Sequence, residues 1–352
     1  MKTKSDTGLI QDEPLLFEHG GEGRRGYSLP HWDVEQVEVE KRIPSQYLRK
    51  ELEGFPQLSE VDVVRHFTRL SQWNYGVDSG LYPLGSCTMK YNPKVNEEVA
   101  RLKGFSLLHP YAAEDLCQGA LRLMYELEGF LAEVTGMDRV TLQPAAGAHG
   151  ELAGLMMVKA CLQARGGQRK KVLVPDTAHG TNCSTSTVAS YQMVEIKSND
   201  RGVISPEKVA ALMDEEVAAI MVTNPNTLGL FEENLKEIAE IVHRKGGFVY
   251  CDGANLNALM GKVKLGEIGV DVVHINLHKT FATPHGGGGP GAGPVAIKKE
   301  LAPYLPIPVI EKRGETFHFN YDLPGSIGKM RAFYGNFGVL LKAYAYALSM
   351  GP

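Results

Sequence analysis

Residues 272–281 read VVHINLHKTF, and residues 282–289 continue as ATPHGGGG. The apolar, β-branched start of this run predicts a buried strand of a parallel sheet. A single lysine, Lys279, follows the strand and precedes the glycine-rich loop. Because glycine lets the backbone come close to a ligand, this pattern predicts a reactive amine held at a strand end. We therefore take Lys279 as the candidate Schiff-base lysine.

A second apolar run ends in a carboxylate. Residues 248–254 read FVYCDGA, which places Asp252 at the end of another predicted strand. The segment between Asp252 and Lys279 is long enough for a crossover helix and a return strand. The sequence thus predicts that this acid and this amine reach the same edge of one sheet and face one cavity. Taken singly, each has a plainer interpretation, a solvated surface lysine and a turn-forming aspartate.

The composition is that of a globular chain with a large core. Its 352 residues are 43% hydrophobic and 22% charged, with a formal net charge of −4. This charge, without a long basic run, argues against a nucleic acid partner, and no apolar stretch is long enough to span a membrane. The five cysteines form no C-x-x-C pair, and the polar first thirty residues contain no secretory leader. We therefore expect a cytoplasmic protein without a metal site.

The pattern along the chain predicts an α/β fold. Strand-like runs at 140–142, 171–174, 193–196, 218–222, 248–250 and 272–275 alternate with helical patterns at 112–134, 151–164, 206–213 and 235–245. Such alternation is typical of a mainly parallel sheet flanked by helices, with ligands bound beyond the carboxyl ends of the strands. The first of the helical patterns counts Leu116 among its apolar positions.

Three regions follow from this pattern. We expect an N-terminal arm with short helices at 1–105 and a large α/β domain at 106–305. Residues 306–352 would form a linker and the first helix of a small C-terminal domain that is otherwise missing, because the apolar helix expected at 337–350 needs a packing partner.

Pyridoxal phosphate chemistry would use both candidate residues. It needs an amine, a carboxylate that keeps the pyridine nitrogen protonated, an anion cradle for the phosphate, and a flat group against the ring. Lys279 and Asp252 would supply the first two, and an opposite charge in a water-poor site favours the protonated ring nitrogen.

The other two requirements could be met by residues 143–151, QPAAGAHGE, a predicted strand-to-helix turn of small residues. Free N–H groups in a first helical turn bind anions, so the backbone of Ala146, Gly147 and Ala148 would hold the phosphate. His149 would lie beside the ring, although a capping histidine is an equally good interpretation.

Two further polar turns follow predicted strands. In residues 223–229, TNPNTLG, either Thr223 or Asn224 could hydrogen-bond the phenolic oxygen of the cofactor, or the segment is a plain turn. In residues 176–182, DTAHGTN, His179 could line the substrate side, although capping of the next helix is the simpler interpretation.

The glycine run also matches a dinucleotide motif in form. Gly286, Gly288 and Gly291 fit G-x-G-x-x-G, but Pro290 and Pro294 interrupt the helix that this motif requires. The following residues look like a strand, and the run lacks the Gly-Lys-Ser/Thr ending of a triphosphate loop. We therefore reject both nucleotide interpretations.

These motifs together resemble the P-protein of the glycine cleavage system. The residues that carry the resemblance are LHKT at 277–280, YCDGAN at 250–255, AGAHGE at 146–151 and PLGSCTMK at 83–90. The runs PLLFE at 14–18 and GRRGYSLP at 23–30 resemble subunit 2 of the two-subunit bacterial form. The resemblance covers essentially the whole chain.

The resemblance implies a fold-type-I pyridoxal-phosphate enzyme, glycine dehydrogenase (decarboxylating), in which Lys279 carries the cofactor and His278 joins the cofactor-binding set. It implies that glycine loses CO2 and that the aminomethyl group passes to the lipoyl arm of the H-protein. It also implies pairing with a subunit 1 of similar fold that lacks the lysine. Ser86, Thr88 and His179 are candidates for contact with the substrate.

Two alternatives stay open. The chain could be another enzyme of this fold class, such as a cysteine desulfurase or an aldolase acting on a β-hydroxy amino acid. A desulfurase needs a mobile cysteine near Lys279, whereas Cys251, beside Asp252, is expected to be buried. The chain could instead be a non-catalytic scaffold subunit, although a scaffold has no reason to place an amine opposite a carboxylate.

Overall fold

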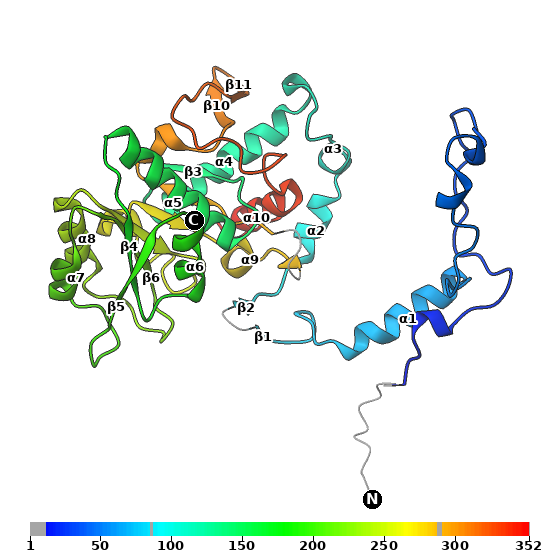
Figure 1. The fold of residues 1–352 in the computed structure, drawn as a ribbon, viewed down its shortest axis with the longest axis horizontal. Helices are drawn as coiled ribbons and strands as arrows, with labels where there is room; N and C mark the ends of the chain where they lie inside the picture. Colours follow the sequence, from blue (N-terminus) through cyan, green and yellow to red (C-terminus); the bar gives the residue numbers. More distant parts are fainter. Residues whose placement is uncertain (1–11, 85–86, 287–290, 352) are drawn as a thin grey trace, which may run out of the picture. The chain divides into compact units, whose positions relative to one another are not determined.

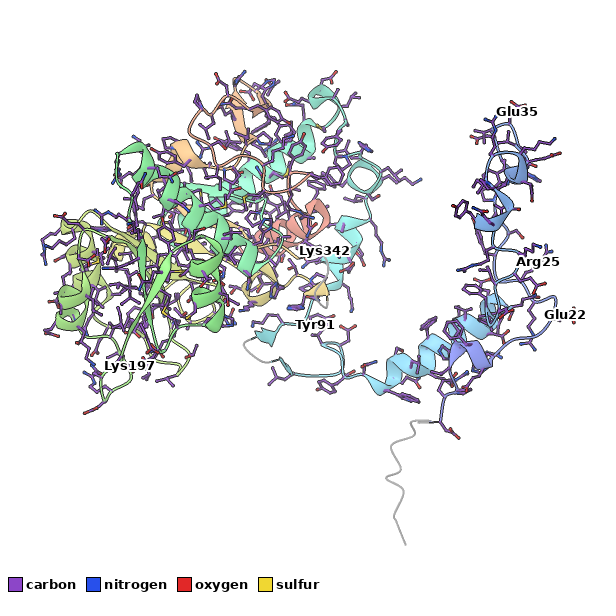
Figure 2. All side chains as sticks on the ribbon, in the orientation of Figure 1. Glu22, Arg25, Glu35, Tyr91, Lys197 and Lys342 are labelled. Carbon is purple, nitrogen blue, oxygen red and sulfur yellow. The ribbon has the colours of Figure 1, made fainter. Side chains whose placement is uncertain are left out.

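A computed structural model describes residues 12–84, 87–286 and 291–351 (Figure 1). The chain divides into two compact units, residues 1–80 and residues 81–352. This division lies before the sequence-based boundary near residue 105, because α2 (Lys94–Ala100) packs against α10 (Phe337–Met350) in the second unit. An ion pair joins these helices, with 2.7 Å between Nζ of Lys342 and Oε1 of Glu97 (Figure 2).

The second unit is built on a seven-stranded sheet with the strand order β3-β9-β8-β7-β6-β4-β5. The strands are β3 (Arg139–Thr141), β4 (Lys171–Pro175), β5 (Gln192–Ile196), β6 (Val217–Thr223), β7 (Phe248–Asp252), β8 (Val272–His274) and β9 (Val295–Ile297). Strands β4 to β8 run parallel to one another, whereas β9 is antiparallel to both of its neighbours. The predicted strands and the mainly parallel sheet are confirmed.

Helices cover both faces of this sheet (Figure 1). They include α4 (Gln118–Thr135), α5 (Gly147–Ala164), α6 (Gly180–Val188), α7 (Pro206–Leu212) and α8 (Leu235–Arg244). The short α9 (Leu277–Thr280) follows β8, and the short α3 (Lys103–Ser106) lies away from the sheet (Figure 1). Side chains alternate along each strand, so Ile220 and Val249 join the core formed with α4, α8 and α10. Met221 and Tyr250 point the other way and join the core formed with α5. None of the described helices is both long and apolar enough to cross a membrane.

The connection between β7 and β8 differs from the prediction of a crossover helix. It contains only the 3-10 helix η5 (Leu265–Ile268). Gly269 ends this turn in the left-handed region, with φ of 92°, and a Cβ at this position would lie 2.5 Å from that of Ala239 in α8. Gly269 thus lets the chain pass close to α8 before it enters β8.

The helix predicted from residue 112 begins later, at Gln118. Residues 114–116 form the 3-10 helix η4 instead, and Leu116 is 74% exposed rather than part of the apolar face. The Glu114 carboxylate accepts a hydrogen bond from the backbone N–H of Phe319 at 3.0 Å, which ties this turn to a distant strand. A contact with a residue so far along the chain leaves no local signal.

Two hairpins also belong to the second unit. Strands β1 (Tyr82–Leu84) and β2 (Cys87–Met89) pair near its start, and β10 (Val309–Arg313) pairs with β11 (Thr316–Asn320) within the segment predicted as a linker. Gly314 makes the second turn possible because it adopts a φ of 61°.

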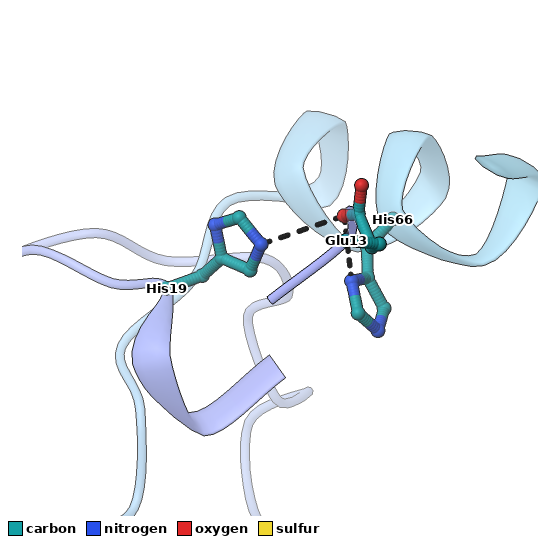
Figure 3. Close-up of side chains that lie close together, drawn as sticks. All are labelled: Glu13, His19 and His66. Carbon is teal, nitrogen blue, oxygen red and sulfur yellow. Dashed lines mark hydrogen bonds and ion pairs between the residues drawn. The ribbon is translucent and has the colours of Figure 1, made fainter. Parts of the chain in front are cut away.

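The first unit is held by one buried carboxylate. Glu13 accepts a hydrogen bond from Nη2 of Arg69 at 2.7 Å and lies 2.9 Å from Nδ1 of His66, both on α1 (Glu60–Trp73). His19 adds a contact of 3.5 Å between its Nε2 and Oε1 of Glu13 (Figure 3). Arg69 is the main reason why the pKa of Glu13 falls to about 2. The cluster fastens residues 13–19 to α1.

The rest of the first unit has little regular structure. Besides α1 it contains the 3-10 helices η1 (Leu16–Glu18), η2 (Val39–Lys41) and η3 (Ser45–Tyr47). Helix α1 begins with a capping box, in which the Ser59 hydroxyl accepts from the backbone N–H of Asp62 and the Asp62 carboxylate accepts from that of Ser59. The irregular arm predicted for this region is therefore anchored by one stable helix.

Candidate active site

A cavity of about 710 Å³ opens at the carboxyl ends of the parallel strands, where ligands of open α/β sheets bind. Most of the residues predicted for the site line it: Ala146, Gly147, Ala148, His179, Thr223, Asn224, Asp252, His278 and Lys279. His149 is not in the lining. Ser86 lies outside the described residues, as does the side chain of Thr88.

Lys279 lies in α9, the helical turn that follows β8. Only 6% of its surface is exposed, so the interpretation as a solvated surface lysine is wrong. Among the described residues no carboxylate forms an ion pair with its Nζ. A buried amine without a counter-charge is unfavourable, which indicates that the position serves a ligand rather than the core.

Asp252 is the last residue of β7 and pairs in register with His274 of β8. Its Oδ2 accepts a hydrogen bond from Nδ2 of Asn182 at 3.2 Å, and its Oδ1 accepts one from the backbone N–H of Ala254 at 3.1 Å. Nε2 of His274 lies 3.4 Å from Oδ1. With 5% of its surface exposed, this carboxylate is fixed by partners and is more than a turn former.

The first turn of α5 faces the cavity. Ala146 is the N-cap and offers no side-chain cap, so the N–H groups of the first turn are open to a ligand. A Cβ at Gly147 would lie 2.8 Å from Oδ1 of Asn276, which explains the need for glycine at this position. The eighteen-residue helix adds the positive end of its dipole, so this turn suits a phosphate group.

The two candidate histidines differ in how they relate to the cavity. Nδ1 of His149 accepts a hydrogen bond from the backbone N–H of Ala145 at 3.2 Å, which ties the ring to the turn before α5. Burial, and then the charge of Arg331, lower the pKa of His149. His179 lines the cavity and also caps α6, where its Nδ1 accepts from the backbone N–H of Thr181 at 3.2 Å. The prediction that His179 is a cap is confirmed.

In the turn after β6, hydrogen bonds distinguish the two residues that were predicted to donate to the phenolic oxygen of the cofactor. The hydroxyl of Thr223 accepts from the backbone N–H of His179 at 3.0 Å and donates to Oδ1 of Asn182 at 3.2 Å, so its single donor is used. Oδ1 of Asn224 accepts from the backbone N–H of Glu232 at 3.0 Å, whereas its buried Nδ2 has no partner among the described residues. Asn224 is thus the residue with a donor to offer.

A sequence model of the glycine cleavage system P-protein matches residues 32–312 of the chain. The chain belongs to this family. A probable glycine dehydrogenase (decarboxylating) subunit 2 from Bacillus velezensis is 58% identical over 343 residues, which are 97% of this chain and 70% of the relative. A protein of the same name from Caldanaerobacter subterraneus is 59% identical over 344 residues, 97% of this chain and 71% of the relative.

A solved structure shares the fold. Glycine decarboxylase (P-protein) of the glycine cleavage system, in inhibitor-bound form, superposes with a TM-score of 0.73 at 22% identity. The match covers 89% of this chain and 72% of that one. The expected fold-type-I architecture is therefore confirmed for this member of the P-protein family.

The site of this P-protein family member also contains residues that sequence reasoning missed. Glu151 of α5 lines the cavity and is buried. Its carboxylate accepts hydrogen bonds from Oγ1 of Thr181 at 2.6 Å, Nδ2 of Asn182 at 2.9 Å and Oγ1 of Thr185 at 3.1 Å. Asn182 therefore bridges Glu151 and Asp252. In the sequence, the only local sign of Glu151 was its place after Gly150 at the end of the AGAHGE motif.

His278 lies next to Lys279 in the cavity wall. Its ring packs edge-on against that of His285, with 4.5 Å between the ring centroids. Burial, followed by the nearby charges of His285, Lys279 and Lys90, lowers the pKa of His278 to about 4. The imidazole is therefore neutral at physiological pH.

Proposed function

We propose that this chain is the lysine-bearing subunit of glycine dehydrogenase (decarboxylating) and uses pyridoxal phosphate to release CO2 from glycine. The observation that carries the proposal is that Lys279 and Asp252 are both buried and line one cavity, Lys279 from the turn α9 after β8 and Asp252 from the end of the neighbouring strand β7. The likeness to subunit 2 of glycine dehydrogenase over 97% of the chain supports the same reaction.

The residues of the cavity fit this cofactor. Two buried polar atoms in its wall, Nδ2 of Asn224 and Oδ1 of Asn276, have no hydrogen-bond partner among the described residues, so a polar ligand would satisfy them. The first turn of α5 would hold the phosphate through the N–H groups of Gly147 and Ala148. Nδ2 of Asn224 would donate to the phenolic oxygen.

Each charged residue has a separate role in the reaction. Lys279 would hold the cofactor covalently through its amine, and Asp252 would keep the ring nitrogen protonated. When bound, the cofactor supplies the electron sink for the bond that breaks as CO2 leaves. Of the two candidate histidines, His179 lines the cavity and His149 does not, so His179 would lie against the ring or the substrate. The neutral His278 would pack beside the Lys279 amine without adding a second positive charge there.

The aminomethyl group would pass to the lipoyl arm of the H-protein, and the chain would pair with a subunit 1 of similar fold. Exposed apolar side chains in the first unit support a partner protein, among them Tyr27 at 78%, Leu29 at 79% and Trp32 at 70% exposure. Unpaired thiols at Cys117, Cys161, Cys183 and Cys251 support our placement of the protein in the reducing cytoplasm.

Absorbance tests the cofactor and the lysine directly. Added pyridoxal phosphate should give a new band near the boundary of the visible range, and Lys279→Ala should abolish it. Lys299→Ala, which removes an exposed lysine, should leave the band intact. No band in the wild-type chain would favour a scaffold subunit.

Exchange of labelled bicarbonate with the carboxyl group of glycine tests the reaction. We expect exchange when subunit 1 and lipoylated H-protein are added. Release of alanine from cysteine would instead favour a desulfurase. The structure gives that alternative little support, because no described cysteine lines the cavity and Cys251 is fully buried.

A further inference from the structure

From the cavity wall, where Asp252 and His274 both lie, a chain of polar side chains runs into the core. Nε2 of His274 lies 3.4 Å from Oδ1 of Asp252, and Nδ1 of His274 lies 2.5 Å from the hydroxyl oxygen of Tyr250. The exposed fractions are 5% for Asp252, 1% for His274 and 0% for Tyr250. Three largely buried polar groups thus connect the cavity wall with the core.

The packing of α5 against the sheet keeps this chain in place. The rings of Tyr250 and His274 stack with 6.0 Å between centroids and 25° between planes. Gly150 and Gly154 of α5 face them, and a Cβ at Gly154 would lie 2.8 Å from Cε2 of Tyr250. At Gly150 a Cβ would lie 3.3 Å from that of His274. These glycines let the helix pass directly over both rings.

The two contacts of the imidazole favour one tautomer. A carboxylate can only accept, so the nitrogen that faces Asp252 is the one expected to carry the proton. In the neutral ring Nδ1 then accepts, and the Tyr250 hydroxyl donates to it. Burial raises the pKa of Tyr250 well above its ordinary value, so the hydroxyl keeps its proton for this bond.

We propose that His274 is a positioning residue that holds the Asp252 carboxylate toward the cofactor ring, and that Tyr250 fixes the tautomer in which His274 can do so. This inference depends on the proposed function, because the ring nitrogen is what Asp252 would contact. Without the contact from His274, the Asp252 carboxylate would be less well oriented toward the ring nitrogen.

The sharpest test uses Tyr250→Phe, which removes one hydroxyl and keeps the ring stack. The probe is pyridoxal phosphate labelled with nitrogen-15 at the pyridine nitrogen, whose chemical shift reports protonation. We expect the shift to move toward the neutral ring, and the Kd for the cofactor to rise about fivefold, the effect of one lost hydrogen bond.

Tyr191→Phe is the matched control. Tyr191 is also buried, at 5% exposure, but its hydroxyl has no partner among the described residues. We expect the wild-type shift and Kd from this variant. Equal changes in both variants, or no change in Tyr250→Phe, would overturn the role proposed for Tyr250 and His274. If the wild-type chain gives no cofactor band at all, the proposed function fails instead.

A second measurement needs no substitution. In the chain labelled with nitrogen-15 histidine and loaded with cofactor, His274, assigned through His274→Gln, should show one protonated nitrogen at Nε2 and one bare nitrogen at Nδ1. An imidazolium or the opposite tautomer would contradict the proposal. His274→Gln keeps an N–H donor, so we expect it to retain more of the wild-type cofactor shift than His274→Ala.

Discussion

At the scale of single residues, the charge of Asp252 can be separated from its shape. Asp252→Asn keeps the size of the side chain but loses the charge that would hold the ring proton. We expect the cofactor band to remain and the bicarbonate exchange rate to fall roughly 100-fold, the scale of one electrostatic contact in a catalytic site. Asp176→Asn is a control, because Asp176 follows β4 but is exposed. Wild-type exchange in Asp252→Asn would remove the role given to this carboxylate.

Asn224 offers an equally small change. Asn224→Asp keeps the oxygen that accepts from Glu232 but replaces the free Nδ2 donor by an acceptor. We expect the Kd for pyridoxal phosphate to rise about tenfold or more, since an acceptor would then face the phenolic oxygen. Thr223→Ser, which keeps the neighbouring hydroxyl, should bind the cofactor normally. Titration of the absorbance band measures both, and equal affinities would exclude Asn224 as the donor.

His278 should make the stability of the cofactor-free chain depend on pH. Its folded pKa of about 4 lies below the ordinary value of 6.5, so between these values the unfolded chain binds a proton that the folded chain does not. Stability should therefore decrease as pH falls from 6.5 to 4, by at most about 3 kcal/mol. Thermal unfolding of wild type and His278→Gln at several pH values measures this contribution as their difference. A difference that does not change with pH would contradict it.

At the scale of secondary structure, the contact of α5 with β7 and β8 decides how the site is built. Gly147, Gly150 and Gly154 recur three and four residues apart and so form one face of α5. That face allows close approach to Asn276, His274 and Tyr250 respectively. The helix can therefore begin at the cavity and still lie flat on β7, which ends in Asp252, and on β8.

A single methyl group should disturb that contact. Gly154→Ala places a Cβ 2.8 Å from atoms of both Tyr250 and Val272, and we expect a loss of about 1–3 kcal/mol in the free energy of unfolding. Gly129→Ala in α4 is the control, since nothing lies within 4 Å of its Cβ. There we expect a gain of up to about 1 kcal/mol from the helix propensity. Urea unfolding compares them, and a neutral Gly154→Ala would mean that the contact is looser than described.

At the scale of the whole molecule, the two units contain different kinds of side chains. Every residue that lines the cavity belongs to the unit of residues 81–352. In the unit of residues 1–80, the described side chains include many exposed apolar groups, whereas the side chains of His66 and Glu13 are buried. The first unit is therefore suited to contact with another protein surface, and the second to chemistry.

Removal of the first unit tests this division. We expect residues 81–352 alone to keep the cofactor band and its Kd, and to associate less tightly with subunit 1. Absorbance titration and analytical ultracentrifugation measure the two properties. Loss of the band with the fold intact, as judged by circular dichroism, would show that the first unit contributes to the site.

The sequence by itself determined the sheet, the edge at which the cavity lies, and the presence of Lys279 and Asp252 in its wall. These features are encoded locally, because an apolar run that ends in one polar residue reveals both a buried strand and what stands at its end. Only the tertiary structure decided that His179 rather than His149 lines the cavity, and that Asn224 rather than Thr223 has a free donor. These choices depend on hydrogen bonds between segments far apart in the chain, such as Asn182 to Asp252, for which no local pattern exists.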